Sequence, residues 1–325
     1  MTSPFSIAYG QNAEDVVLHR ALRDVDAGFY VEVGANDPTE LSISRPFYDA
    51  GWRGIEIEPV AELAEEFRRQ RPRDSVVRAA ITTADVESVT LHLIEGTGLS
   101  TLDAEISSGH AESGYPSHEV QVPARTLRSV LAGADVPEDI HFMVVDTEGT
   151  EADVLASMDW QRWRPWVLVI ESTRPLSTTP THTAWEPDLL AAGYEFCLFD
   201  GVSRFYVAQE HADRLREPLS HPANVLDGFT PLHWSRREQE FAAGRAELAE
   251  LRALYARTLE DLIRWRGAVL TRWTEAASGG GAGGVQSGHE VVRLREELAA
   301  THATLSWRVT APLRSVQERR LRGWR

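Results

Sequence analysis

Up to about residue 210, short runs of apolar residues recur along the chain, and segments of helical periodicity separate most of them. Runs rich in β-branched and aromatic side chains predict strands at 29–33, 54–58, 76–81, 89–94, 140–145, 166–171, 194–199 and 203–208. Segments with apolar residues on one face predict helices at 12–24, 60–70, 125–133, 149–158 and 184–192. Strands that alternate with helices indicate an α/β fold with a mainly parallel, doubly wound sheet. A hairpin-type turn separates the last two strands, so we expect the sheet to end in an antiparallel hairpin.

After about Trp234 the apolar residues follow alternating spacings of three and four, which is the heptad pattern of a coiled coil. Gly244 and Thr258 interrupt this heptad seam, whose other members are Phe241, Leu248, Leu251, Tyr255, Leu262, Trp265 and Val269. A Gly-rich stretch at 278–284 predicts a flexible linker. Beyond it come a basic tail and a second seam at Val291, Leu294, Leu298 and Leu305.

The chain is therefore expected to contain an α/β domain at 1–234 and a helical, coiled-coil extension at 235–325. An amphipathic helix gains most of its stability from packing, so its apolar stripe needs a partner surface. We expect this surface to be another copy of the chain, which would make the protein a homo-oligomer. The alternative is a long helix that packs back on its own domain.

Composition narrows the function further. The 325 residues carry a formal net charge of -16, which argues against broad nucleic-acid binding because a phosphate-tracking surface needs clustered cations. Cys197 is the only cysteine, so neither a disulfide framework nor a thiolate metal cluster is expected. No run of 18 apolar residues and no secretion-type start occur, so we expect a cytoplasmic protein without a transmembrane segment. Its Arg-rich end is a candidate for peripheral contact with the inner face of the membrane.

The first two predicted strands end in residues typical of an adenosine site. Gly34 would let the backbone turn sharply after the first strand, where a ligand must approach closely. Glu58, at the tip of the second strand, is placed to accept hydrogen bonds from both ribose hydroxyls. A dinucleotide fingerprint would need further glycines where Asn36 and Pro38 stand, which disfavours a nicotinamide oxidoreductase. An adenosine ligand without phosphates, namely S-adenosylmethionine, fits this turn better.

Four segments then occur in a characteristic order: 6–15 (Ser-Ile-Ala-Tyr-Gly-Gln-Asn-Ala-Glu-Asp), the Val-Gly-Ala-Asn turn at 33–36, Gly-Leu-Ser-Thr-Leu at 98–102, and 140–149 with its Asp-Thr-Glu-Gly end. In these segments the chain resembles the FkbM family of S-adenosylmethionine-dependent O-methyltransferases over about residues 5–230. The family usually has Val where this chain has Thr147. The resemblance implies a Rossmann-like class I methyltransferase fold and an acceptor hydroxyl on a sugar, glycolipid, polysaccharide or polyketide.

The expected cofactor contacts follow the strand ends. The resemblance and the turn together place Glu32, Gly34, Ala35 and Asn36 beside the methionine part and Glu58 beside the ribose. Ala80, in the segment 79–81, is expected beside the adenine. Asp146 ends the strand that precedes the Asp-Thr-Glu-Gly segment, and it would lie near the methionine end or the incoming hydroxyl.

A sugar hydroxyl needs a base or a metal to take its proton as the new bond forms. Asp146, Glu148 and His182 are the candidate catalytic residues, and His182 is the natural base near neutral pH. Asp146 could instead cap the helix that starts near Gly149. A divalent metal held by Asp146 and Glu171 is the less favoured route, because two carboxylates on adjacent strand ends do not by themselves make a site.

Candidate acceptor residues lie in loops. Gln11 and Asn12 open a helix that the resemblance places as a lid, although such polar residues more often form a cap and a solvated first turn. Ser100 lies in a loop-rich connection, and the face of Trp185 could stack on a sugar ring unless it packs in the core. Together these residues predict O-methylation of a sugar, glycan or glycosylated metabolite. The alternative is a noncatalytic cofactor-fold scaffold that organises glycan-assembly enzymes through its coiled coil.

Overall fold

The computed structural model describes residues 6–278 and 286–303, and the chain divides into two compact units, 1–242 and 243–325. The domain boundary expected at 234 lies inside one continuous helix, Leu232–Ser278. Apart from Ser278, the predicted Gly-rich linker at 278–284 lies outside the described residues, as do Leu305 and the basic tail. Among the described residues no helix combines the length and the apolar character that a membrane span requires.

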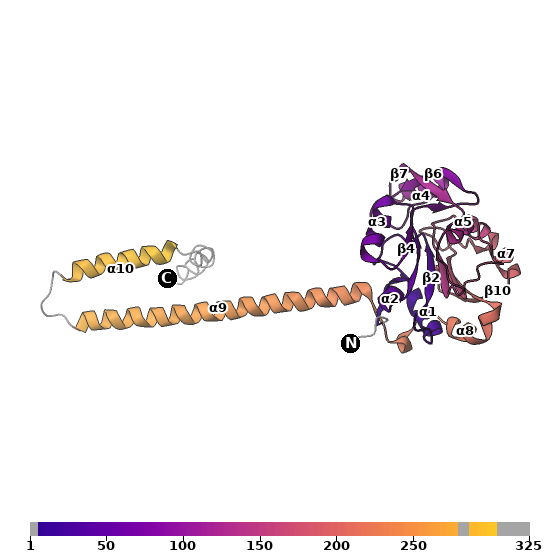
Figure 1. Cartoon of the computed structure of the whole chain (residues 1–325). Coiled ribbons are helices and arrows are strands. Elements are labelled where there is room, and N and C mark those ends of the chain that lie inside the picture. The colour runs from indigo at the N-terminus through magenta and orange to yellow at the C-terminus, as the bar shows by residue number, and fades with distance from the viewer. Residues whose placement is uncertain (1–5, 279–285, 304–325) are drawn as a thin grey trace. The chain divides into compact units, whose positions relative to one another are not determined.

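Figure 1 labels many of the helices and strands of the chain. The strands are β1 (Ile7–Ala8), β2 (Phe29–Val33), β3 (Arg53–Ile57), β4 (Ser75–Val77), β5 (Ala80–Ile81), β6 (Val86–Leu93), β7 (His118–Arg125), β8 (Phe142–Val145), β9 (Val167–Glu171), β10 (Tyr194–Phe199), β11 (Ser203–Ala208) and β12 (Thr230–Pro231). The helices are α1 (Glu14–Leu22), α2 (Arg45–Asp49), α3 (Ala61–Gln70), α4 (Ala104–Glu112), α5 (Leu127–Ala132), α6 (Glu151–Ala156), α7 (Glu186–Ala191), α8 (Ala212–Leu219), α9 (Leu232–Ser278) and α10 (Gln286–Ala303).

The main sheet has the strand order β10-β11-β9-β8-β2-β3-β4. Strands β2, β3, β4, β8 and β9 run parallel, whereas β11 is antiparallel to both β9 and β10. This arrangement confirms the predicted class I methyltransferase fold, a mainly parallel sheet closed by an antiparallel hairpin. Because β3, β2, β8 and β9 are neighbours, the residues that follow their carboxyl ends meet at one edge of the sheet, where ligands of such sheets bind.

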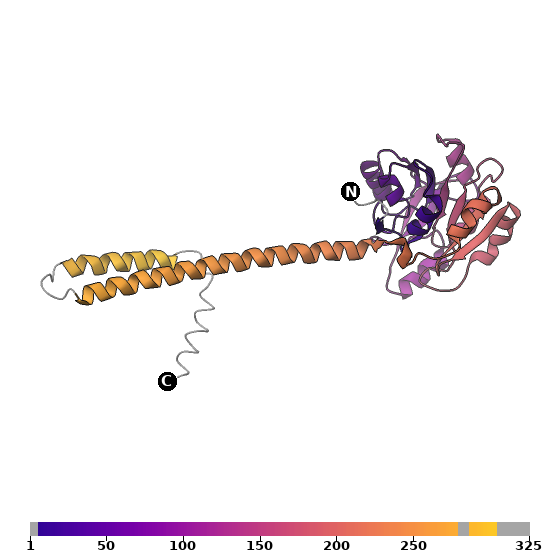
Figure 2. The same ribbon diagram turned by 90° about the horizontal axis from the view of Figure 1, so that it is seen from below.

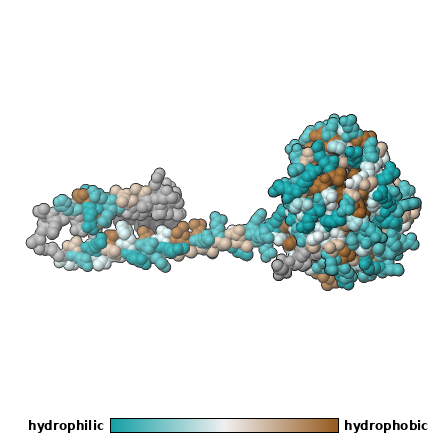
Figure 3. Space-filling model, in the orientation of Figure 1, coloured by the Kyte–Doolittle hydropathy of each residue, from teal (hydrophilic) through white to brown (hydrophobic). Residues whose placement is uncertain are grey.

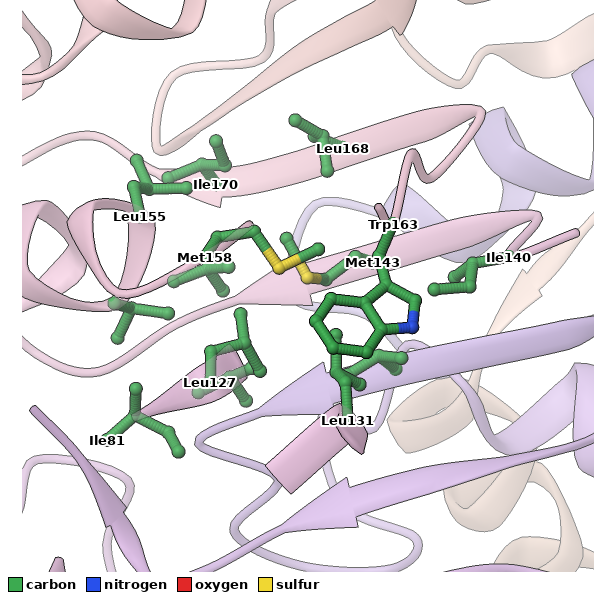
Figure 4. Close-up of a cluster of buried hydrophobic side chains, with 14 of the residues drawn as sticks. Ile81, Leu127, Leu131, Ile140, Met143, Leu155, Met158, Trp163, Leu168 and Ile170 are labelled. Carbon is green, nitrogen blue, oxygen red and sulfur yellow. The ribbon is translucent and has the colours of Figure 1, made fainter. Parts of the chain in front are cut away.

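Both faces of the sheet are buried, which explains its continuous apolar strands. One face packs on α5, α6 and α7 through residues such as Met143, Leu168 and Ile170 (Figure 4). The alternate residues of the same strands, among them Tyr30 and Phe142, face α1, α2 and α8. Figures 1 and 2 show the strands running through the centre of the first unit with helices on both sides.

The structure corrects three of the predicted elements. The strand expected at 76–81 is two short strands, of which β4 closes one edge of the main sheet and β5 belongs elsewhere. The strand expected at 89–94 is part of β6, in a separate three-stranded sheet of order β5-β7-β6. Only Leu91 of β6 is buried, so this strand lacks the two covered faces of a central one. The connection around Ser100, expected to be loop-rich, contains α4 and β7.

Candidate active site

Two cavities lie at the carboxyl edge of the main sheet, with volumes of about 310 Å³ and about 70 Å³. The same five residues line both of them: Gly34, Asn36, Gly98, Asp146 and Glu148. These residues come from the loops after β2 and β8 and from the connection after β6. The two cavities therefore share one wall, built largely from the segments that carried the family resemblance.

The smaller cavity combines an apolar lining with one buried carboxyl group. Its walls include Ala80 and Ile81 of β5, Leu91 of β6 and Leu102. Glu58 follows β3 and is only 4% exposed. This combination suits a flat apolar ring next to a hydroxyl-bearing group.

Backbone amides hold the Glu58 carboxyl group in place. The N–H of Asn36 donates to Oε2 at 2.8 Å, and the N–H of Val60 donates to Oε1 at 2.7 Å. Burial raises the pKa of Glu58 to about 7, although both of these hydrogen bonds act in the opposite direction. Each carboxyl oxygen can still accept a further hydrogen bond from a ligand hydroxyl.

The turn after β2 has a backbone that only glycine fits. Gly34 has a φ of 82°, and a Cβ at this position would lie 1.7 Å from the backbone oxygen of Asp146. The N–H groups of Gly34 and Ala35 both donate to the carbonyl of Ile57, at 3.0 and 3.2 Å. Asn36 follows with a φ of 52°, in a left-handed region that Asn enters more readily than most residues.

Three carboxyl groups converge on the larger cavity. Asp146, Glu148 and Glu171 each place one oxygen within 4.8 Å of the others. Oε2 of Glu148 and Oε2 of Glu171 are buried without a hydrogen-bond partner among the described residues. Burial and then repulsion by neighbouring carboxylates raise the pKa to about 7 for Asp146, about 9 for Glu148 and about 12 for Glu171. We refer to these three residues as the acidic triad.

The backbone around the acidic triad is held by side chains from two directions. Glu151 of α6 accepts three hydrogen bonds at Oε1, from the N–H and hydroxyl of Thr147 and from the N–H of Gly149. The hydroxyl of Thr101 donates to the carbonyl of Glu148 at 2.8 Å. Glu148 itself has a φ of 52°, so its backbone conformation depends on these contacts.

The larger cavity is strongly acidic. No arginine, lysine or histidine occurs among its lining residues in the described part of the chain. The acidic lining residues are Glu14, Glu32, Glu40, Asp146, Glu148 and Glu171. A ligand with a positive or neutral polar group therefore fits this cavity better than an anion.

The start of α1 contributes to this cavity in an unexpected way. Gln11 lines it, whereas Asn12 does not and donates instead to Asp200 at 3.3 Å. Glu14 and Asp15 are each 1% exposed, so the first turn is not solvated. Burial raises the pKa of Glu14 to about 8 and that of Asp15 to about 7.

Glu32 belongs to a buried polar network behind the larger cavity. The hydroxyl of Ser44 donates to Glu32 and, at 3.1 Å, to Glu56. The Arg71 guanidinium donates to Glu56 at 2.7 Å and to the carbonyl of Pro38. Arg71 and Glu56 are fully buried, so this network fixes the loop that contains Pro38 and Ser44 next to the cavity.

Three of the acceptor-side predictions change with the structure. His182 lines neither cavity, and its Nε2 lies 3.8 Å from Glu186, so it is not placed as the base. Trp185 is 5% exposed and packs edge-on against Tyr206, so the prediction of a stacking surface was wrong. Ser100 lines the smaller cavity rather than the larger one, and its hydroxyl accepts from the N–H of Ile94 at 3.1 Å.

Comparison with known protein families relates the chain to methyltransferases. The model of the methyltransferase FkbM domain matches residues 32–196, a span that contains Gly34, Glu58 and the acidic triad. No curated protein is significantly similar to the chain.

Several solved structures are similar in fold. A precorrin-6y C5,15-methyltransferase from Geobacter metallireducens GS-15 is 12% identical and has a TM-score of 0.33, covering 61% of this chain and 87% of that one. A glycopeptide N-methyltransferase with sinefungin is 11% identical and has a TM-score of 0.33, covering 62% of this chain and 87% of that one. An O-methyltransferase from Bacillus cereus with SAH is 13% identical and has a TM-score of 0.33, covering 59% of this chain and 78% of that one.

Proposed function

The chain belongs to the FkbM family of methyltransferases, and we propose that it transfers a methyl group from S-adenosylmethionine to a hydroxyl of a sugar, a glycan or a glycosylated metabolite. The observation that carries this proposal is the wall shared by the two cavities. A donor in the smaller cavity and an acceptor in the larger one would meet beside Asp146 and Glu148. Such a meeting point is what a direct transfer between two bound molecules requires.

The donor side fits the adenosine part of S-adenosylmethionine. The adenine would lie among Ala80, Ile81 and Leu91, and Glu58 would accept hydrogen bonds from the ribose hydroxyls. The turn from Gly34 to Asn36 lines the larger cavity together with the acidic triad, which would place the methionine part next to the triad. When bound, this donor supplies a methyl carbon on a sulfonium sulfur, whose positive charge suits an acidic surrounding.

The acceptor side fits a neutral, hydroxyl-rich molecule. Carboxylates accept hydrogen bonds from sugar hydroxyls, and the larger cavity offers them on several sides. His182 does not line the larger cavity, whereas Asp146, the other candidate base, does. Asp146, with a pKa raised to about 7 by burial and by Glu151, is suited to this exchange near neutral pH.

Incubation of the protein with methyl-labelled S-adenosylmethionine and a panel of glycosides tests the proposal. We expect label in an acid-stable methyl ether of one acceptor class, together with formation of S-adenosylhomocysteine. Label in an amine or a carboxyl ester would contradict O-methylation of a hydroxyl. A protein that binds S-adenosylhomocysteine but labels no acceptor would favour the scaffold alternative.

We also propose that the C-terminal unit associates with further copies of the chain. The apolar residues of α9 are exposed in the single chain, including Leu251 at 61% and Trp273 at 71%. Figure 3 shows such residues interspersed with hydrophilic ones along this helix. A row of exposed apolar side chains on a helix is typical of a surface that packs against another helix.

A further inference from the structure

The strongest unassigned feature of the molecule is the acidic triad itself. Its three residues come from two neighbouring strand ends: Asp146 directly follows β8, Glu148 follows two residues later, and Glu171 ends β9. Like charges at this distance repel one another, and no basic side chain among the described lining residues of the larger cavity offsets them. The arrangement is unfavourable unless a proton or a cation completes it.

The spacing of the triad oxygens matches one bound cation. Opposite oxygen ligands lie about 4.2 Å apart around Mg²⁺ and roughly 4.6–5.2 Å apart around Ca²⁺, twice the usual metal–oxygen distances. The triad oxygens all lie within 4.8 Å of one another. This limit lies within the span of a Ca²⁺ coordination sphere, and the triad would have to close by a few tenths of an ångström to surround Mg²⁺.

A second observation points to a ligand at this place. Glu171 is only 6% exposed, and its Oε2 has no hydrogen-bond partner among the described residues. Oε2 of Glu148 is likewise buried and unpartnered. Buried carboxyl oxygens are rarely left unsatisfied, because each one loses its hydration without a replacement.

We propose that Asp146, Glu148 and Glu171 bind one divalent cation with a preference for oxygen ligands, such as Mg²⁺, Mn²⁺ or Ca²⁺. Three carboxylates leave several positions of such an ion free, and all three residues line the larger cavity. The free positions can take water or two neighbouring hydroxyls of the acceptor. The role of the cation in holding an acceptor rests on the proposed function, whereas its binding does not.

Titration of the chelator-treated full-length protein with Mn²⁺, followed by electron paramagnetic resonance, tests the site directly. We expect one equivalent of Mn²⁺ to bind and an excess of Mg²⁺ or Ca²⁺ to displace it. Glu171→Gln should lower the affinity for Mn²⁺ at least tenfold. The matched control is Glu40→Gln, which neutralises another carboxylate of the same cavity outside the triad and should leave Mn²⁺ affinity unchanged.

Folding and donor binding are checked in the same variants. Glu171 lines the larger cavity but not the smaller one, to which the adenosine part of the donor is assigned, so Glu171→Gln should bind adenosine as the unaltered protein does. Absence of Mn²⁺ binding by the unaltered protein would overturn the inference and leave shared protons as the explanation of the triad. Equal Mn²⁺ binding by both variants would also overturn it, since the ion would then lie elsewhere.

The outcomes separate this inference from the proposed function. Undiminished methyl transfer in chelator, with no Mn²⁺ binding, would refute the cation site and support the methyltransferase function. Mn²⁺ binding that depends on Glu171, without methyl transfer to any acceptor, would support the cation site and refute the proposed function.

Discussion

The Cα of Gly34 faces the backbone carbonyl of Asp146 so closely that a Cβ at position 34 would lie 1.7 Å from its oxygen. The turn after β2 and the start of the acidic triad are therefore in direct contact. Gly34 lines both cavities, and so does Asp146. Any change that pushes these two segments apart alters the donor and acceptor sides together.

Gly34→Ala is expected to destabilise the fold and to abolish donor binding. The new methyl group meets backbone rather than a flexible side chain, and Ala at a φ of 82° is strained as well. Together these effects cost roughly 3–5 kcal/mol. Urea denaturation and calorimetry with S-adenosylhomocysteine measure the two consequences.

Gly228→Ala is the matched control for this substitution. Gly228 has a φ of 68°, and nothing lies within 4 Å of a Cβ added there. Only the conformational cost of about 1–2 kcal/mol remains. Equal destabilisation by the two substitutions would show that the contact with Asp146 does not decide the choice of glycine.

Donor affinity should increase with pH around neutrality because of Glu58. Burial raises its pKa to about 7, and the ionised form accepts the ribose hydroxyls best. If only this form binds, the dissociation constant for S-adenosylhomocysteine falls about tenfold between pH 6 and pH 8. Calorimetry at both pH values measures it, and Glu58→Gln should bind weakly and without this pH dependence.

The same residue affects folding with the opposite sign. Its folded-state pKa lies above the ordinary value of 4.5, so the folded protein holds this proton more tightly. The stability that Glu58 contributes is present below about pH 4.5 and is lost as the pH rises through about 7. The free energy of unfolding of Glu58→Gln, relative to that of the unaltered protein, should therefore be higher at pH 8 than at pH 5.

Arg71→Met is expected to destabilise the first unit by about 3–5 kcal/mol, because it leaves the carboxyl group of Glu56 buried without its partner. Adding Glu56→Gln removes the stranded charge and should recover part of the loss. Arg68→Met in α3, the helix that ends just before Arg71, should have little effect because its partner Glu65 is exposed. Denaturant midpoints of the three variants test this order, and an equal effect of Arg71→Met and Arg68→Met would contradict it.

The charge of the larger cavity predicts discrimination between acceptors. A neutral glycoside and the corresponding uronic acid differ by one carboxylate, and the described lining residues of the larger cavity offer this carboxylate no arginine, lysine or histidine as a partner. We expect kcat/KM, measured without added divalent cation, to be at least tenfold lower for the uronic acid. Comparable kcat/KM values for the two acceptors would contradict a neutral substrate class.

The parts predicted best from the sequence are those in which one strand or turn decides the geometry. Gly34, Glu58 and Asp146 lie directly after parallel strands, and the carboxyl ends of such strands meet at one edge whatever the loops do. The strand at 89–94 was misplaced because an apolar run does not reveal which sheet it joins. In its partner strand β7, apolar residues alternate with polar ones, a pattern that a central strand buried on both faces would not have.

Loop residues were predicted poorly because their orientation depends on tertiary contacts. Trp185 looked accessible in a polar loop, yet it packs against Tyr206 on a strand twenty-one residues later in the sequence (206 − 185 = 21). His182 lies beside Glu186 and away from both cavities. Arg71 gave no sequence signal at all, since its partners Glu56 and Ser44 come from separate segments.

The C-terminal unit provides a test of the heptad seam that leaves the first unit unaltered. Leu262 belongs to the seam, whereas its neighbour Ile263 lies off it, and both are exposed in the single chain, by 50% and 63%. If the seam forms the interface, a charge on it is buried on association and a charge beside it is not. The two positions thus form a matched pair on one helix.

Leu262→Glu is expected to dissociate the protein into single chains, and Ile263→Glu is expected to leave the assembly intact. Burial of an unpaired carboxylate in a seam costs several kcal/mol for each copy, and Gly244 and Thr258 already weaken this seam. Light scattering measures the mass, and methyl transfer should be equal in both variants because α9 lines neither cavity. An unaltered protein that is already a single chain would refute association, and dissociation by Ile263→Glu alone would move the interface to the other face of α9.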